Sequence, residues 1–238
     1  MSDFLKEIND KKTSAKNRRD LRRYDRAAAL LKQAIDLADH EYSTTNVPEW
    51  RATVVSELAD CWGILGGVER RWALDPNSDA EQRTTHLRQS ISAYDKGFEY
   101  ESSALPGSAS TYNRLNRLIS RLLLNPERLV ADGNAADQEP GGTVNVRAEL
   151  TVIRNQIEQD KIESVWTAAD FALLNVLLGR QDAASAYSAF EKMQVPDFAC
   201  QSALDVVAPL AAVDLVTAGE LKNAEKRLTA LLSRLLTH

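Results

Sequence analysis

The sequence predicts an all-α protein built from paired helices. Apolar residues recur at intervals of three and four along most of the 238-residue chain, as they do on one face of an α-helix. No segment keeps the apolar–polar alternation of a half-buried strand. The chain has only 10 Gly and 7 Pro, which argues against a turn-rich β-sandwich or barrel.

The first half of the chain is expected to hold four helices. The first has one apolar stripe that includes Tyr24 and Leu31, and the second has Pro48 in its first turn. Ser78 and Glu81 have the spacing of a capping box, which predicts the start of the third. The expected helices cover residues 16–43, 47–72, 78–100 and 109–124.

The second half is expected to hold five more helices. Pro209 is expected to kink the fourth of them. Residues 125–143 are rich in turn-forming residues and poor in apolar ones, which predicts a flexible connection. The whole chain, residues 1–238, is expected to form a single helical-repeat domain. The five helices cover about 144–160, 163–178, 182–193, 199–217 and 220–236.

Three glycines lie inside the second expected helix, although each costs a helix about 1 kcal/mol relative to Ala. Gly63, Gly66 and Gly67 form a smooth strip on one face. One interpretation is close approach of a neighbouring helix. Another is exposed backbone beside Arg70 and Arg71, open to an anionic ligand. Both interpretations can hold together.

Polar residues in the helix at 109–124 form a second candidate site. Asn113, Asn116, Arg117 and Ser120 are spaced i, i+3, i+4 and i+7, so they share one face, whereas Tyr112 belongs to the opposite, buried stripe. Amides and a guanidinium on one face suit a phosphate or a nucleobase edge. The alternative is a solvated face. The candidate ligand- or partner-binding residues are Arg70, Arg71, Tyr112, Asn113, Asn116 and Arg117.

Charge is unevenly distributed. The chain has a net charge of −5, but residues 11–32 hold nine Lys or Arg and two Asp, a net charge of +7. Such a block indicates either a basic helix face docked on an acidic neighbour or a nucleic-acid arm. Cys61 and Cys200 lie in apolar stretches far apart, which predicts buried thiols rather than a disulfide.

The sequence shows no sign of an enzyme or a metal site. G-x-S-x-G, P-loop, H-E-x-x-H and CxxC motifs are absent, and the three His have no catalytic neighbours in sequence. We therefore expect no catalytic residues, no cofactor and no metal. The chain has no apolar run of membrane-spanning length, and its N-terminus is too polar for a signal peptide, so a cytoplasmic location is expected.

An internal repeat points to a family of helical-repeat proteins. In "LRRYDRAAALLKQAIDLA" an aromatic residue is followed by Ala at +3, Leu at +7 and Ala at +10. "LRQSISAYDKGFEYE" and "LGRQDAASAYSAFEKM" repeat parts of this pattern. The pattern resembles the second helix of a tetratricopeptide repeat, where small residues lie at helix contacts. The resemblance implies an α-solenoid of about four to five degenerate helix pairs.

Three fragments carry a narrower resemblance. "ELADCWGILGGVERRW", "SISAYDKGFEYES" and "TYNRLNRLISRLLLNPERL" are similar to the regulatory tetratricopeptide domain of bacterial conflict systems. That domain is related to the TRAF-binding central region of the apoptosis signal-regulating kinases. The resemblance implies a non-enzymatic adaptor or sensor in antiviral defence, whose caspase-like, TIR or NTPase effector is a separate chain.

The resemblance also implies where a partner binds. The helices at 47–72 and 109–124 would be first helices of neighbouring pairs, which line the concave surface of such repeats. Arg70 and Arg71 would then lie on the same side as the polar face of the later helix. Two alternatives remain open: a sensor of a small nucleotide-like anion, and a nucleic-acid-binding protein that uses residues 11–32.

Overall fold

The computed structural model describes residues 2–104, 111–129, 145–160, 162, 164–215 and 217–237. These residues form ten α-helices and one short 3-10 helix, with no strand among them, so the all-α prediction is confirmed. The chain divides into two compact units, Met1–Leu124 and Asn125–His238.

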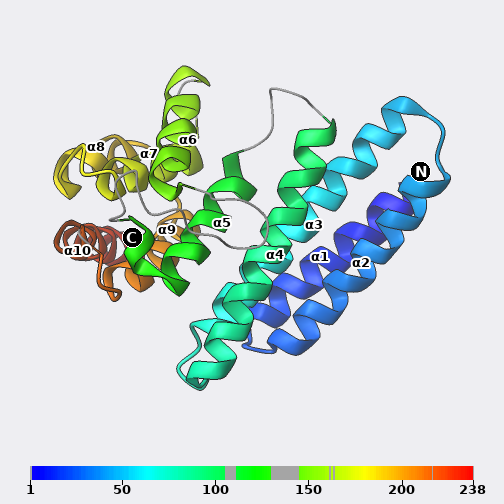
Figure 1. Cartoon of the computed structure of the whole chain (residues 1–238), viewed down its shortest axis with the longest axis horizontal. Helices are drawn as coiled ribbons and strands as arrows, with labels where there is room; N and C mark the ends of the chain where they lie inside the picture. Colours follow the sequence, from blue (N-terminus) through cyan, green and yellow to red (C-terminus); the bar gives the residue numbers. More distant parts are fainter. Residues whose placement is uncertain are drawn as a thin grey trace. The chain divides into compact units, whose positions relative to one another are not determined.

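The first unit contains five long helices that pack in chain order. They are α1 (Ser2–Asp20), α2 (Tyr24–Thr44), α3 (Pro48–Ala73), α4 (Ala80–Ala104) and α5 (Thr111–Leu124). Figure 1 shows α1 to α4 as neighbouring helices, coloured from blue to green. α3 packs against α1 and α5 as well as α2 and α4. The described backbones of α2 and α4 stay apart, and these two helices meet through side chains, where the hydroxyl of Tyr100 on α4 donates to Oδ1 of Asp39 on α2 at 2.8 Å. The first unit therefore has one row of α1, α3 and α5 and a second row of α2 and α4, as successive helix pairs require.

A tight turn between α1 and α2 replaces the single helix expected over residues 16–43, so that prediction is wrong. Arg22 has a φ of 55°, in the left-handed region. The backbone N–H of Arg23 donates to the carbonyl of Arg18 at 2.9 Å, and that of Arg22 donates to Arg19 at 2.9 Å. This is the Schellman pattern that ends a helix. The position is usually Gly, so an Arg there leaves no sequence signal.

The capping box of α4 lies one residue later than predicted. The backbone N–H of Asp79 donates to Oε1 of Gln82 at 3.0 Å, and the backbone N–H of Gln82 donates to Oδ1 of Asp79 at 2.8 Å. Ser78, predicted to pair with Glu81, instead donates its hydroxyl to the carbonyl of Trp72 at 2.7 Å. Ser78 closes the end of α3, which leaves Asp79 to open α4.

The core of the first unit lies between α1, α2 and α3. Small residues on α2 let the three helices approach closely, and larger residues on α3 fill the space between them. Cys61 is a free, buried thiol in this core, as predicted. The fully buried residues of this core include Ile8, Ala27, Leu31, Ala34, Val54, Leu58 and Val68.

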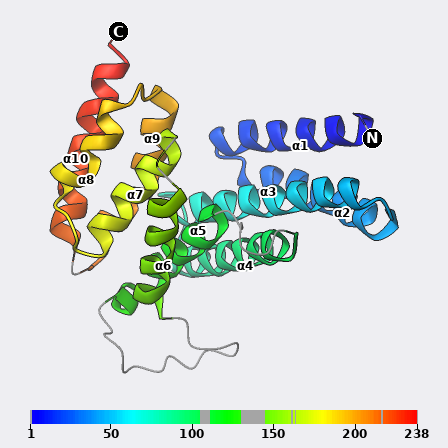
Figure 2. The ribbon, with the colours of Figure 1, turned by 90° about the horizontal axis from the view of Figure 1, so that it is seen from above.

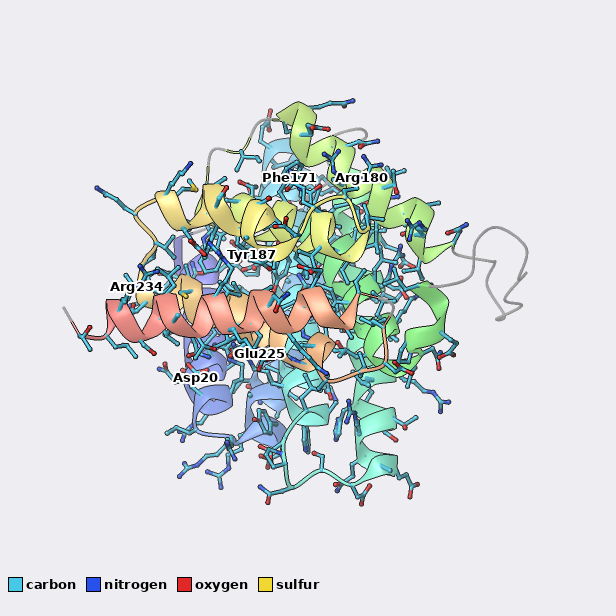
Figure 3. The ribbon with its side chains drawn as sticks, turned by 90° about the vertical axis from the view of Figure 1, so that its left-hand side faces the viewer. Asp20, Phe171, Arg180, Tyr187, Glu225 and Arg234 are labelled. Carbon is cyan, nitrogen blue, oxygen red and sulfur yellow. The ribbon has the colours of Figure 1, made fainter. Side chains whose placement is uncertain are left out.

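The second unit packs shorter helices. They are η1 (Pro126–Leu129), α6 (Val146–Asp160), α7 (Val165–Leu177), α8 (Ala183–Lys192), α9 (Asp197–Ala211) and α10 (Ala218–Leu235). α7 packs on α8 and α9 on α10, and α10 also lies beside α8 (Figure 2). Tyr187 on α8 is buried near α10, on which Figure 3 labels Glu225.

Two predictions for the second half concern chain breaks. The helix expected over 199–217 is shorter, because α9 ends two residues after Pro209. Residues 130–144, most of the expected connection at 125–143, lie outside the described residues. The flexibility of this connection therefore stays a prediction, as does the organisation of residues 1–238 as a single domain.

Candidate functional site

The polar face of α5 is buried against α3 and α4. Asn113, Asn116, Arg117 and Ser120 share one side of the helix, as their spacing predicted, but they do not face solvent. Leu115, Leu118 and Leu122 on the other side are buried too. We call the four polar residues, with the groups that they contact on α3 and α4, the polar seam.

Asn113 occupies space that two glycines leave open. Its Nδ2 donates to the carbonyl of Ala59 on α3 at 3.3 Å and to Oε1 of Glu101 on α4 at 3.0 Å. A Cβ atom on Gly63 or on Gly97 would lie 2.6 Å from the Asn113 amide. These two glycines, one on each neighbouring helix, therefore admit the amide between α3 and α4.

Gly66 and Gly67 differ in their surroundings. A Cβ on Gly66 would lie 2.8 Å from the buried ring of Tyr94, whereas the nearest atom to a Cβ on Gly67 would be the Tyr94 hydroxyl at 3.5 Å. The carbonyl of Gly66 accepts a hydrogen bond from Ser90 at 2.8 Å. The packing interpretation of the glycine strip therefore holds at Gly63 and Gly66, where side chains of α4 and α5 cover the backbone.

Arg70 contacts α5, a closer approach than the shared side that the family resemblance implied. Its Nη1 donates to Oδ1 of Asn116 at 2.7 Å, and Nδ2 of Asn116 donates to the carbonyl of Tyr112 at 2.9 Å. The Arg70 guanidinium also lies 5.9 Å from the centre of the Tyr94 ring. Tyr112 was assigned to the buried stripe, and this holds only in part: the residue is 45% exposed, whereas its ring packs on the buried Tyr94 and burial raises the pKa of its hydroxyl. Arg70 and Tyr112 thus form the rim of the polar seam.

Arg117 forms an ion pair inside the first unit. Its Nη1 donates to Oδ1 of Asp95 at 2.8 Å, and its guanidinium lies 5.4 Å from the centre of the Phe98 ring. Arg121, one turn further along α5, lies 3.7 Å from the same carboxylate. An anionic ligand at Arg117 would therefore compete with Asp95.

Arg71 contacts the end of α1 and not α5. Its Nη1 lies 3.4 Å from Oδ1 of Asp20, at the end of α1. The structure thus brings together five of the six candidate residues and places Arg71 beside the turn between α1 and α2. Side chains of consecutive helix residues point about 100° apart, which accounts for the different partners of Arg70 and Arg71.

Glu101 and Tyr94 belong to the polar seam and were not predicted. Burial raises the pKa of the Glu101 carboxyl to about 7, the hydrogen bond from Asn113 opposes the rise, and nearby Asp60 adds to it. Within the described residues, Oε2 of Glu101 and Oδ1 of Asn113 are buried without a hydrogen-bond partner. The one sequence signal for Glu101 is its position four residues after Gly97, on the same face of α4.

A histidine–carboxylate pair lies between α3 and α4. Nδ1 of His86 is 2.7 Å from Oε2 of Glu69, and the ring stacks on Trp72 with centroids 3.9 Å apart. This pair was not predicted, because its members are 17 residues apart. In the part of the chain that the structure describes, no group of three or more His, Cys, Asp or Glu is arranged to hold a metal ion.

The basic segment at 11–32 is partly docked on α3. Nζ of Lys12 lies 2.6 Å from Oε2 of Glu57 and 2.8 Å from Oδ2 of Asp60. Burial lowers the pKa of Lys12, but the hydrogen bonds to the two carboxylates outweigh it and raise the pKa. Docking on an acidic neighbour therefore holds at Lys12, while a nucleic-acid arm stays a prediction.

Comparison with known proteins supplies one match. The family model described as Tetratricopeptide Repeats-Sensor matches residues 5–123, which is half of the chain and almost all of the first unit. Comparisons with curated proteins and with solved structures found no match. None of the helices in the described ranges is long and apolar enough to cross a membrane.

Proposed function

Because the chain belongs to the Tetratricopeptide Repeats-Sensor family, we propose that it binds a separate effector protein and regulates it as part of a bacterial defence system. The observation that carries this proposal is the family match over α1 to α5. Helical repeats of this kind offer extended surfaces to protein partners. The resemblance of the sequence to conflict-system domains suggests a caspase-like, TIR or NTPase effector.

The pairing of charged groups in the first unit supports a binding role rather than a catalytic one. Arg117 is paired with Asp95, and Lys12 with Glu57 and Asp60. A group that acts on a substrate needs access to it, and these side chains are engaged with the protein itself.

The rim of the polar seam is the contact surface that we propose for the effector. Tyr112 is half exposed there, and the Arg70 guanidinium is fixed by Asn116 behind it. An aromatic side chain beside an ordered arginine is a common composition of binding hot spots. Arg71, held by Asp20, would lie outside this contact.

Affinity purification of the tagged full chain from its own cells tests the proposal. We expect one effector chain in near-stoichiometric amount and at least tenfold less of it with Tyr112→Ala. Leu21→Ala removes another exposed apolar side chain of the first unit and serves as a control that retains the effector. Recovery of nucleic acid in place of a protein, or equal recovery with both variants, would contradict the proposal.

A second candidate function is recognition of a small nucleotide-like anion at the polar seam. It is favoured by two buried atoms of the polar seam that lack partners within the described residues, Oε2 of Glu101 and Oδ1 of Asn113. Buried polar groups are costly unless something satisfies them. Native mass spectrometry of the gently purified protein should then show a bound mass of a few hundred daltons, and a spectrum of the bare chain would count against this function.

A further inference from the structure

The turn between α1 and α2 carries five arginines around an exposed leucine. It joins the first two helices of Figure 1. Residues 16–26 hold six Lys or Arg and two Asp, a net charge of +4 in a chain whose net charge is −5. Leu21, in the middle of this segment, is 62% exposed. We call Leu21 and the five arginines around it the arginine turn: Arg18, Arg19, Arg22, Arg23 and Arg26.

Three arginines of this turn have no partner inside the protein. Across the described ranges, the side chains of Arg18, Arg23 and Arg26 make no hydrogen bond and no ion pair. Arg23 and Arg26 are exposed, and Arg18 is partly exposed. Asp25 lies in the same segment, but it forms an ion pair with none of them. Docking on an acidic neighbour, which accounts for Lys12, therefore does not account for these three charges.

The other carboxylates close to the arginine turn are already engaged. Oδ1 of Asp20 lies 2.9 Å from Nε of Arg19 and 3.4 Å from Nη1 of Arg71. Oδ2 of Asp75 lies 3.8 Å from Nε of Arg22, whose side chain is still 64% exposed. The acids of the protein thus pair with Arg19, Arg22 and Arg71, which leaves the three unpartnered guanidinium groups to another molecule.

The backbone of the arginine turn is ordered. Two hydrogen bonds of 2.9 Å close it, from the N–H of Arg23 to the carbonyl of Arg18 and from the N–H of Arg22 to that of Arg19. Arg22 has a φ of 55°, where Gly is favoured, so an Arg there lowers stability and indicates a role for its side chain. Leu21 is held between the arginines on this fixed backbone, so a partner that binds it orders little of this surface.

We propose that the arginine turn binds an acidic segment of a partner protein. Asp or Glu side chains of that segment pair with Arg18, Arg23 and Arg26, because the planar guanidinium matches the geometry of a carboxylate. A large apolar side chain of the same segment packs on Leu21. An exposed leucine adds nothing to a contact with a phosphate backbone, which is bound through charge, and this favours a protein over a nucleic acid.

This inference goes beyond the proposed function. The effector is proposed to bind at the rim of the polar seam, which includes no residue of the arginine turn, and Leu21→Ala retains it. The acidic segment therefore belongs to a second partner. Failure of one proposal leaves the other standing, because each has its own variants.

Three synthetic peptides test the arginine turn. The first is a short peptide of Glu and Asp around a central Leu, the second has Ser in place of that Leu, and the third has Lys in place of every acid. Titrated into the full chain at low salt, the first should bind with a Kd on the order of 100 μM or tighter, as for a small interface. The Ser peptide should bind several-fold more weakly, and the Lys peptide should not bind at that concentration.

Variants locate the binding. Arg23→Ala combined with Arg26→Ala should weaken the acidic Leu peptide at least tenfold. Leu21→Ser should lower the affinity for the Leu peptide to that for the Ser peptide and leave the Ser peptide unaffected. Arg22→Gly should weaken the Leu peptide about threefold, as for loss of an exposed charge pair, although its melting temperature should rise.

Arg88→Ala serves as the matched control for these variants. Arg88 is exposed on α4 and likewise makes no ion pair in the part of the chain that the structure describes, so its loss should leave the affinity for all three peptides unchanged. The variants at Leu21, Arg23 and Arg26 are also at exposed positions, so their melting temperatures should stay close to that of the wild type.

Three results would overturn the proposal. They are equal binding of the acidic Leu peptide and the Lys peptide, unchanged affinity in the variants of the arginine turn, and tighter binding of a short DNA duplex that Leu21→Ser does not weaken. The last result would identify nucleic acid as the occupant.

Discussion

Gly66 and Gly67 are adjacent in α3, yet a side chain would fit at only one of the two positions. Gly66 faces the ring of Tyr94 closely, and Gly67 does not. The sequence places both in one strip, since a helical pattern cannot show which glycine has a large neighbour. The contact belongs to tertiary packing, in which a side chain of α4 fills the gap.

Alanine at the two positions should therefore have opposite effects. Gly66→Ala should lower the free energy of unfolding by about 1–3 kcal/mol, because the new methyl group would overlap the Tyr94 ring. Gly67→Ala should raise it by up to about 1 kcal/mol through helix propensity. Denaturant unfolding of the two variants measures both changes, and shifts of the same sign would show that Tyr94 does not limit the packing.

The buried carboxyl of Glu101 predicts a pH dependence. Its folded pKa of about 7 lies above the ordinary value of 4.5, so the carboxyl stays protonated in the fold at a pH where the unfolded chain releases the proton. Glu101 therefore contributes stability below about pH 4.5 that is lost as the pH rises to about 7.

Glu101→Gln should remove this loss of stability at rising pH, because the amide does not titrate. Since Glu101 is partly accessible to solvent, we expect the variant to lose about 1–2 kcal/mol less free energy of unfolding than the wild type between pH 5 and pH 8. Denaturant unfolding at several pH values measures the difference. Parallel stability curves for the two proteins would place the carboxyl in water instead.

At the scale of helices, the sequence predicted which residues share a face of a helix but not what that face packs against. The spacing correctly put Asn113, Asn116 and Arg117 on one face of α5, and it indicated a site because polar faces usually meet solvent or a ligand. That face is buried because Gly63 and Gly97 admit the amide and because Asp95 neutralises the guanidinium. Such compensation depends on residues far away in the chain.

Sequence patterns also fail to locate the ends of helices to the residue. Ser78–Glu81 and Asp79–Gln82 both satisfy the spacing of a capping box, and only the hydrogen bond of Ser78 to the end of α3 decides between them. The left-handed Arg22 is invisible to rules that expect Gly at that position.

The ion pair between α5 and α4 makes Arg117 a structural residue in this account. Arg117→Ala should lower the free energy of unfolding by about 1–3 kcal/mol, because Asp95 and nearby buried polar groups would lose a charged donor. Arg88→Ala, at an exposed position of α4, should change it by less than about 0.5 kcal/mol. If Arg117→Ala melts like the wild type but loses the effector, Arg117 is instead the binding residue that the sequence indicated.

At the scale of the whole molecule, the chain contains two compact units, and the family match covers the first. The sequence predicted helices and repeats for both. It also placed a turn-rich connection at residues 125–143, next to the division between the units, but helical periodicity continues on either side of that segment and does not show where one compact unit ends.

Limited proteolysis examines the connection between the units. The turn-rich composition of residues 125–143 predicts that a non-specific protease cleaves there first and leaves a fragment close to residues 1–124. Mass spectrometry of the products identifies the site. Early cleavage inside α3 or α4, with residues 125–143 intact, would contradict the prediction.

The central claim, that this chain regulates a separate effector, is tested most directly by the activity of the effector recovered with it. Purified effector should be assayed alone and with saturating wild-type chain, with Tyr112→Ala as the variant impaired in binding. The account predicts that the wild-type chain changes the effector's rate at least tenfold and that Tyr112→Ala needs a much higher concentration to do so. An effector whose rate is the same with and without the chain would contradict it.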